Sequence, residues 1–272
     1  MPTPQSRPTP RISVELVPRN AEALHAELDA LRDHFPFIDT VNIPDLTRFS
    51  LRSHHACKLS QTRVRRAIPH LRAVGTDLKD LTPLLSFLDE AELHEVLVVT
   101  GDLPADMSRP TYPTTSVQLV RAIKAALPHV TVYAALDPYR HSLMRERDYA
   151  FEKLDAGASG LFTQPFFDTR LMQVYRELLP DVNLYWGVTT ITSQRSLGYW
   201  QNRNHAVFPA HFEPTLAWSR RFAAAALAFA QETGTNLYFM PIKADLRAFL
   251  EGVLTLEACR PPENGIKTEV SA

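Results

Sequence analysis

Short apolar segments alternate with amphipathic segments from one end of the chain to the other. Residues 11–17 read Arg-Ile-Ser-Val-Glu-Leu-Val, an alternation of polar and apolar positions that is typical of a strand with one buried face. Residues 94–102 contain the clearest strand, in which an apolar run leads into a Thr-Gly-Asp turn. Further strands are predicted at 37–43, 67–74, 130–136, 160–164, 182–188 and 236–242.

Amphipathic segments follow these strands and predict helices. The pattern places them at 21–32, 78–91, 117–126, 143–156, 169–179, 214–232 and 245–254, with a loop and a helix within 46–66. The Ser-, Gln- and Arg-rich stretch after residue 188 has no assignment. Consecutive strand–helix units require parallel strands with right-handed crossovers. Eight of them fit a single-domain (β/α)8 TIM barrel, which takes about 250 residues. An open doubly wound sheet is the alternative, but no Gly-rich phosphate-binding motif follows the first strand.

The charge balance narrows the class of partner. The 272 residues include 29 basic and 30 acidic side chains, for a net charge of −1, and no long run of either sign. A nucleic-acid or anionic-membrane surface is therefore not expected to be the main function. No apolar run approaches the ~18 residues of a membrane span. A phosphate-bearing small molecule stays compatible, because one or two cationic side chains suffice to bind it.

The cysteines and the chain ends define the expected domain and its location. Cys57 and Cys259 are far apart, so neither a disulfide framework nor a thiolate zinc site is expected. Residues 1–10 are rich in proline and lack the apolar core of a signal peptide. Residues 259–272 form a polar segment at the other end of the chain. We therefore expect two poorly ordered tails around a barrel domain at 11–258, in a cytoplasmic protein that forms no metal site.

Polar residues at predicted strand ends are the candidates for chemistry, because barrel active sites lie at the C-terminal ends of strands. Glu15 is the most informative, since a carboxylate inside a barrel is costly unless it is paired or functional. Burial would raise its pKa and suit it to general acid catalysis. An ion pair with Lys243 or an arginine is the equal alternative. The full set is Glu15, Asn42, His70, Thr100, Asp102, Asp137, Gln164, Thr189, Thr190 and Lys243.

Other members of this set have simpler explanations. Asp102 follows a glycine, where turn chemistry alone favours aspartate, and His70 could be a satisfied core histidine. Gln164 is more telling, because a buried amide needs partners for both its donor and its acceptor. An amide also matches a heterocycle that presents a donor beside an acceptor, as pterins do. Aromatic side chains near the seventh strand could stack on such a ring, although packing is the commoner use; they are Tyr185, Trp186, Tyr199 and Trp200.

Several segments, in order along the chain, resemble the methylenetetrahydrofolate reductase family. The most specific is Lys153 to Asp168, KLDAGASGLFTQPFFD, which is similar to the family's Lys-x-Asp-Ala-Gly-Ala…Thr-Gln-x-Phe-Phe-Asp. Supporting segments are SVELVPRN at 13–20, PHL at 69–71, VVTGDLP at 98–104, FPAHF at 208–212 and TGTNLYFMPI at 233–242. The family fold is a (β/α)8 barrel, which agrees with the prediction from the apolar pattern.

The resemblance implies reduction of 5,10-methylenetetrahydrofolate to 5-methyltetrahydrofolate with NADH or NADPH. Glu15 would then be the catalytic acid that opens the five-membered ring to an iminium. Asp102 would stabilise the developing positive charge. Gln164 would hold the amide edge of the pterin, and Trp200 would add aromatic contact to the folate. A folate is thus the expected small-molecule partner, and a homo-oligomer is compatible with the sequence.

Departures from the family pattern concern the flavin. Family members usually pass the hydride through bound FAD, and the arginine that precedes Gly-Asp is here Thr100. The Thr-Tyr pair expected after the second strand reads Asn-Ile, and the aromatic expected after the fifth strand is missing. His70, Glu146 and Lys153 do match flavin-contacting positions in type. Together with the ELVPRN start, these losses favour direct hydride transfer from the nicotinamide over transfer through FAD.

Two other functions compete with the reductase. A folate-binding barrel without catalysis would bind a pterin and turn nothing over, but the retention of Glu15, Asp102 and Gln164 counts against it. An unrelated barrel lyase or aldolase would need a Schiff-base lysine or a metal cluster, and Lys243 alone supports that weakly. The segment SHHAC at 53–57 is a conceivable ligand cluster but is more typical of a polar loop.

Overall fold

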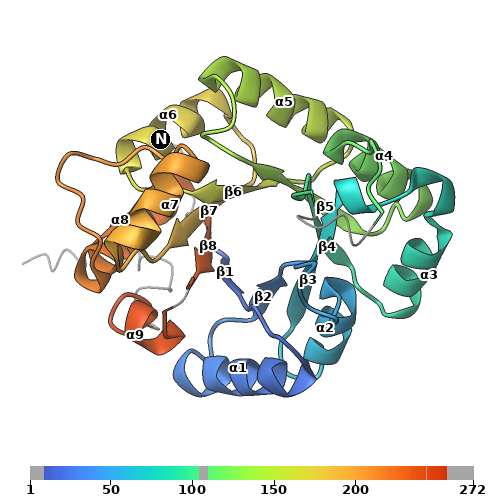
Figure 1. Ribbon diagram of the computed structural model, residues 1–272, viewed down its shortest axis with the longest axis horizontal. Helices are drawn as coiled ribbons and strands as arrows, with labels where there is room; N and C mark the ends of the chain where they lie inside the picture. The colour runs from blue at the N-terminus through green and yellow to red at the C-terminus, as the bar shows by residue number, and fades with distance from the viewer. Residues whose placement is uncertain (1–8, 104–109, 243, 256–272) are drawn as a thin grey trace, which may run out of the picture.

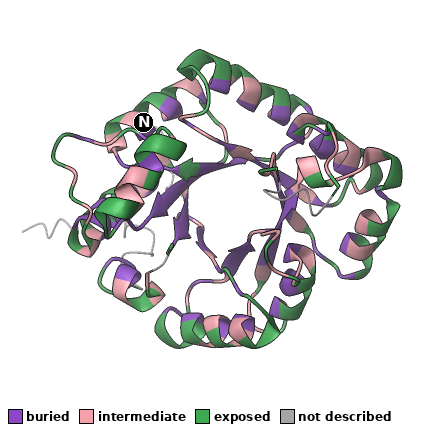
Figure 2. Cartoon of the chain, viewed as in Figure 1, coloured by how far each residue is buried: buried purple, intermediate pink, exposed green. Residues whose placement is uncertain are grey.

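The computed structural model describes residues 9–103, 110–242 and 244–255. Its eight strands form a closed barrel in sequence order, and every neighbouring pair is parallel, including β8 with β1. The helices surround the barrel (Figure 1). Buried positions concentrate in the strands and on the helix faces that meet them (Figure 2). The predicted single-domain (β/α)8 barrel is therefore confirmed.

The bounds of the elements follow. The strands are β1 (Ile12–Glu15), β2 (Thr40–Ile43), β3 (Arg66–Arg72), β4 (Glu95–Val99), β5 (Thr131–Leu136), β6 (Leu161–Pro165), β7 (Leu184–Thr189) and β8 (Asn236–Met240). The helices are α1 (Ala21–His34), α2 (Ser53–Ser60), α3 (Thr82–Glu90), α4 (Ser116–Ala126), α5 (Leu143–Asp155), α6 (Thr169–Leu178), α7 (Gln194–Arg203), α8 (Leu216–Thr233) and α9 (Leu246–Leu250). Two single-turn 3₁₀ helices, η1 (Ala73–Gly75) and η2 (Leu78–Asp80), follow β3.

Local sequence determines several helix ends. The Asn20 side chain accepts a hydrogen bond from the backbone N–H of Ala23 at 2.9 Å and so caps α1. Thr115 and Gln118 form a reciprocal capping box at the start of α4. Gly234 ends α8 in the left-handed conformation, with φ of 64°. These signals fix where α1 and α4 begin and where α8 ends.

Several elements differ from the sequence prediction. The strand expected at 11–17 ends at Glu15, which places this residue at the C-terminal end of β1. The helix expected from residue 78 begins at Thr82, with Pro83 in its first turn, after the short turn η2. The unassigned stretch after β7 contains helix α7, whose apolar signal was weak because Trp200 is its one buried residue.

Some predictions fall on residues outside the described ranges. Residues 1–8 and 256–272 contain most of the two predicted tails, and Lys243 is also outside. The domain limits at 11 and 258 therefore stay predictions. Within the described part of the chain, no helix combines the length and the apolar character that crossing a membrane requires.

Bulky side chains fill the interior of the barrel. Phe162 and Tyr185 stack with ring centroids 4.0 Å apart, and Tyr133 and Tyr238 meet Phe162 edge-on. This interior is a packed core rather than a channel, as in other barrels of this type. Its apolar cluster consists of Ile68, Leu97, Tyr133, Phe162, Tyr185, Tyr238 and Met240.

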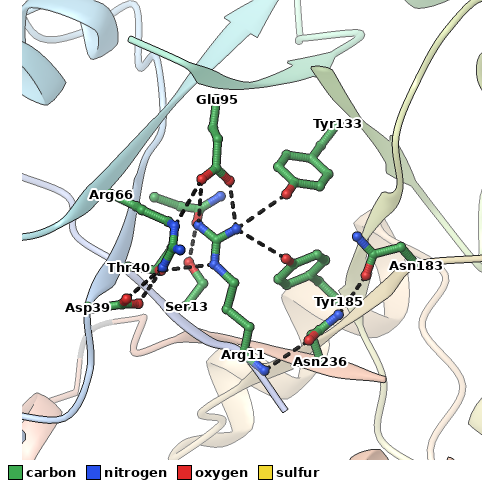
Figure 3. Close-up of polar contacts among 11 residues, drawn as sticks. Arg11, Ser13, Asp39, Thr40, Arg66, Glu95, Tyr133, Asn183, Tyr185 and Asn236 are labelled. Atoms are coloured by element: carbon green, nitrogen blue, oxygen red, sulfur yellow. Dashed lines mark hydrogen bonds and ion pairs between the residues drawn. The ribbon is translucent and has the colours of Figure 1, made fainter. Parts of the chain in front are cut away.

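A polar network closes the N-terminal end of the barrel (Figure 3). Glu95 accepts hydrogen bonds from both terminal nitrogens of Arg11, at 2.6 and 3.1 Å, and forms an ion pair with Arg66 at 3.3 Å. The hydroxyl groups of Tyr133 and Tyr185 lie 3.3 and 3.4 Å from Arg11. Because these groups satisfy one another, we assign this end a structural role and look for chemistry at the opposite end.

Gly187 allows β6 and β7 to approach each other closely. A Cβ atom at this position would lie 2.4 Å from the backbone oxygen of Thr163 and 2.8 Å from Met240. The strand register also shifts beside it, between Phe162 and Pro165. Gly187 is thus the residue that lets β6 reach the barrel mouth in this register.

We predict that Gly187→Ala lowers the free energy of unfolding by about 1–3 kcal/mol, because overpacking forces backbone shifts. Gly198→Ala is the matched control. Gly198 lies within α7, where a Cβ would meet its nearest neighbour, Asn202, at 3.8 Å. Replacing an unhindered helical glycine should stabilise by about 0.5–1 kcal/mol. Urea unfolding measures the free energy of unfolding of both variants. An equal change in the two would contradict the close approach of β6 and β7 at Gly187.

Candidate active site

Glu15 lies at the C-terminal end of β1, beside β8. The register pairs Ser13 with Tyr238, and the Tyr238 hydroxyl donates a hydrogen bond to Oε2 of Glu15. Burial raises the pKa of Glu15 to about 7, although the hydrogen bond from Tyr238 opposes the shift. At neutral pH this carboxyl group is therefore part protonated and can donate a proton, as a general acid must. No ion-pair partner lies within 4.0 Å of Glu15 among the described residues.

A separate set of hydrogen-bonded polar side chains joins β1, β2 and β3, and the strand register pairs Asn42 of this set with Glu15. Ser13 donates to Oδ1 of Asn42, and the Asn42 amide nitrogen lies 3.3 Å from Nε2 of His70. Burial lowers the pKa of His70 to about 3, so its ring is neutral and Nε2 can accept the amide proton. The His70 ring also meets the Tyr238 ring edge-on at 6.3 Å. His70 is thus a satisfied core histidine in this structure, and its contact with a cofactor stays a prediction.

The hydrogen bond from Tyr238 makes the acidity of Glu15 testable. Tyr238→Phe removes a donor that favours the ionised carboxylate, so the pKa of Glu15 should rise by roughly one unit. An NMR titration with isotope-labelled glutamate measures it. Tyr185→Phe is the control, because the Tyr185 hydroxyl lies 3.4 Å from Arg11 at the other end of the barrel. An unchanged titration in the Tyr238 variant would remove this residue from the site.

The turn after β4 carries Thr100 and Asp102, two of the predicted site residues. Gly101 between them has φ of 81°, which favours glycine. The Asp102 side chain is exposed, and its backbone oxygen accepts a hydrogen bond from the Arg72 guanidinium. The Thr100 hydroxyl accepts one from Arg140 at 3.2 Å. Asp102 is therefore free to meet a ligand, while its backbone is held by Arg72.

Glu146 and Lys153 are buried together beside β5. The Lys153 ammonium donates to the Ala135 carbonyl at 2.7 Å and lies 3.9 Å from Oε1 of Glu146. Burial lowers the pKa of Lys153 to about 8 and raises that of Glu146. Their residual exposures are 3% and 1%, so neither offers a surface to a flavin ring. His70 is buried as well, and the contact of these three residues with a flavin stays a prediction.

Gln164 requires a correction. The sequence indicated a buried amide, but Gln164 is exposed at the end of β6, while its neighbours Thr163 and Pro165 are buried. No hydrogen bond to its side chain is present among the described residues. The register shift in this strand has no clear sequence signal, so the sequence alone predicts a buried amide. An exposed amide at the barrel mouth needs no internal partner and is open to a ligand.

Trp200 packs into an aromatic cluster instead of lining an open surface. It is 6% exposed and meets Phe167 at 5.7 Å, and Phe167 in turn meets Phe208 at 4.4 Å. Of the two alternatives for this residue, packing describes its position in the structure. Its neighbour Tyr199 is 55% exposed. If α7 contributes an aromatic face to a ligand, Tyr199 is placed to do so.

The sequence did not indicate some residues of this site, and one segment has a different secondary structure from the one predicted. Tyr238 was overlooked, although it stands two residues from Asn236 and Met240 on alternating β8, which indicates an inward side chain. No sequence pattern indicates that Arg72 and Arg140 lie at the site. The SHHAC segment forms the start of α2 rather than a loop, and its two histidines pack on Phe87.

Fold and site together define a class of protein, a (β/α)8 barrel with a protonatable carboxyl group and polar strand ends at the C-terminal mouth of its interior. Residues 13–233 match the methylenetetrahydrofolate reductase family. The chain belongs to this family, and the resemblance of its motifs is thereby confirmed.

Individual relatives are distant. A 5,10-methylenetetrahydrofolate reductase from Pectobacterium carotovorum subsp. carotovorum is 24% identical over 182 residues, which cover 65% of this chain and 61% of that protein. The chain thus matches less than two thirds of that relative's length. An uncharacterized protein from Clostridium thermocellum that binds two copies of 5-methyl-5,6,7,8-tetrahydrofolic acid has a similar fold, with a TM-score of 0.62 and 13% identity over 91% of this chain and 95% of that one.

Barrels with other activities are also similar in fold. A 2,3-dimethylmalate lyase superposes with a TM-score of 0.55 and 11% identity, covering 89% of this chain and 75% of the lyase. The aldolase QR15 gives a TM-score of 0.52 at 10% identity, with coverages of 88% and 92%. At such identities these likenesses establish the fold alone, and function must be argued from the site.

Proposed function

We propose that this protein reduces 5,10-methylenetetrahydrofolate to 5-methyltetrahydrofolate with NADH or NADPH, by direct hydride transfer without a bound flavin. The observation that carries the proposal is Glu15, an acid with a pKa of about 7 at the mouth of the barrel. Membership of the reductase family supports the substrate, as does the folate bound by the Clostridium thermocellum barrel.

The site residues have distinct roles in this proposal. Glu15 protonates the bridging amine of the substrate, so that the five-membered ring opens and its methylene carbon becomes part of an iminium cation. The carboxylate of Asp102 stabilises that cation, and the exposed amide of Gln164 holds the donor–acceptor edge of the pterin. The nicotinamide supplies a hydride to the iminium carbon, which gives the methyl group and leaves NAD(P)+.

The buried state of His70, Glu146 and Lys153 supports the flavin-free version. Each of the three makes contacts within the protein, and FAD would need them at its own surface. A nicotinamide dinucleotide that enters only for the reaction does not require so extensive a set of fixed contacts.

The test combines a spectrum with a steady-state assay. The purified protein should be colourless and should oxidise NADH or NADPH when methylenetetrahydrofolate is present, with sequential kinetics. A yellow protein with ping-pong kinetics would contradict direct transfer. A colourless protein that binds folate but gives no turnover, even with added FAD, would favour the non-catalytic folate-binding barrel. A cytoplasmic location, a role in methionine biosynthesis and self-association stay predictions.

A further inference from the structure

Two arginines converge on the turn that follows β4. Arg72 ends β3, and its guanidinium donates to the backbone oxygen of Asp102. Arg140 lies in the loop after β5 and donates to the Thr100 hydroxyl at 3.2 Å. A Cβ on Gly101 would lie 2.8 Å from Nε of Arg72, so this guanidinium lies directly against the turn. One three-residue turn thus receives two guanidinium groups at the C-terminal ends of three adjacent strands.

Among the described residues, neither guanidinium forms an ion pair with a carboxylate. The hydrogen bonds of Arg72 and Arg140 go to a carbonyl and a hydroxyl, and among the described residues no carboxylate oxygen lies within 4.0 Å of either. Asp137 is near Arg140 electrostatically, but it accepts a hydrogen bond from its own loop, from the Tyr139 N–H at 3.1 Å. By contrast, Arg52 on the same rim forms a bidentate pair with buried Asp45.

Charges of both signs lie near Arg140, with Lys153 on the positive side and Asp137 and Glu146 on the negative side. Lys153 lies close enough for Arg140 to contribute to lowering its pKa. Helix α5 begins three residues after Arg140, and a helix N-terminus carries partial positive charge. An arginine has five N–H donors in a planar fork that suits bidentate binding of phosphate. Within the described part of the chain each guanidinium donates one hydrogen bond, so donors remain for a ligand.

We propose that Arg72 and Arg140 bind the pyrophosphate group of a dinucleotide above the β4 turn. The sequence has Thr100 where related reductases have an arginine, and Arg140 brings a guanidinium to that residue from the next strand's loop. The inference rests on the proposed function in that NADH or NADPH is the dinucleotide expected. FAD carries the same pyrophosphate, so the two sources are separated by experiment.

The test compares ligands that share or lack the pyrophosphate. For Arg140→Ala in the full chain, the Kd of NADH and of ADP-ribose, which lacks the nicotinamide ring, should rise about tenfold or more. Reduced nicotinamide mononucleotide carries a single phosphate and no pyrophosphate, so its Kd should change much less. Arg140→Lys should restore part of the loss. Arg145→Ala is the matched control, because Arg145 is exposed on α5 and pairs with Glu152 at 3.3 Å.

The possible results separate this site from the proposed reaction. If the Kd values of NADH, ADP-ribose and FAD are all the same for Arg140→Ala and for the unaltered protein, the site is overturned, even if the reductase assay succeeds. Binding of ADP-ribose that depends on Arg140, without any reduction of methylenetetrahydrofolate, would support the site and contradict the reductase. Loss of FAD affinity in Arg140→Ala, with NADH affinity unaffected, would support the pyrophosphate site and identify a flavin as its ligand. Absence of binding by NADH, ADP-ribose and FAD, which all carry a pyrophosphate, would overturn the site.

Discussion

Replacing Glu15 with glutamine is expected to lower kcat/KM for methylenetetrahydrofolate reduction by about 100-fold to 10,000-fold, the usual contribution of a general acid. The amide has nearly the same shape as the carboxyl group, but it cannot protonate the bridging amine of the substrate. Folate binding, measured by calorimetry, should change little because the pterin contacts are untouched. Steady-state rates of NADH and NADPH oxidation provide the kinetic measurement.

Glu27→Gln is the control for this substitution. Burial also raises the pKa of Glu27, but that residue lies on helix α1 outside the barrel, and its carboxylate contacts the backbone of Val17. Its replacement should leave the rate within a factor of about two, since it does not touch the proposed substrate site. A Glu15→Gln enzyme that keeps near-normal turnover would remove Glu15 from the mechanism and leave the source of the proton open.

The raised pKa of Glu15 also predicts how stability depends on pH. The folded protein binds this proton more tightly than the unfolded chain, with a pKa of about 7 against an ordinary value of 4.5. Stability should therefore fall as the pH rises from about 4.5 to about 7, by up to about 3 kcal/mol. Glu15→Gln should lose this pH dependence, so it should match the unaltered protein at low pH and exceed it above pH 7. Denaturant unfolding at several pH values checks the sign.

The second large effect is expected at the opposite end of the barrel, where Glu95 joins two arginines. Glu95→Gln should lower the free energy of unfolding by about 3 kcal/mol, because removing one member of a buried ion pair leaves the partner charge uncompensated. Here Arg11 would lose its carboxylate partner, whereas Arg66 would keep its ion pair with Asp39 at 2.6 Å. The lower part of the usual range applies, since the side chains of Glu95 and Arg11 are still 16% and 19% exposed.

Urea unfolding measures this change, and an unaltered m-value would show that the compactness of the end states is preserved. Glu251→Gln is the matched control, because Glu251 pairs with Arg247 on the exposed face at 3.1 Å and 58% exposure. Such surface pairs contribute about 0–1 kcal/mol. Catalysis by folded Glu95→Gln should be nearly normal, since the network lies away from Glu15. Similar small losses in the two variants would mean that the closing network adds little stability.

The order of strands and helices could be read from the sequence because their causes are local. Alternation in 11–17 and the apolar run in 94–102 predicted β1 and β4, and Asn20 and Gly234 mark helix ends through their own hydrogen bonds and backbone freedom. Parallel pairing of these units then leaves few topologies, of which the barrel is one. Helix α7 could not be predicted, because a polar helix with one buried tryptophan has almost no periodic pattern of apolar residues.

The sequence by itself thus determined the barrel, the family and the positions of Glu15, Asp102 and Gln164 at strand ends. Only the tertiary structure decided what surrounds them. Tyr238 reaches Glu15 across 223 residues of chain, and Arg140 reaches Thr100 across 40. Exposure of the Gln164 amide likewise depends on how β6 meets β7. Strand and helix patterns follow from the spacing of neighbouring residues, whereas hydrogen bonds, burial and pKa values depend on the side chains that barrel closure brings together.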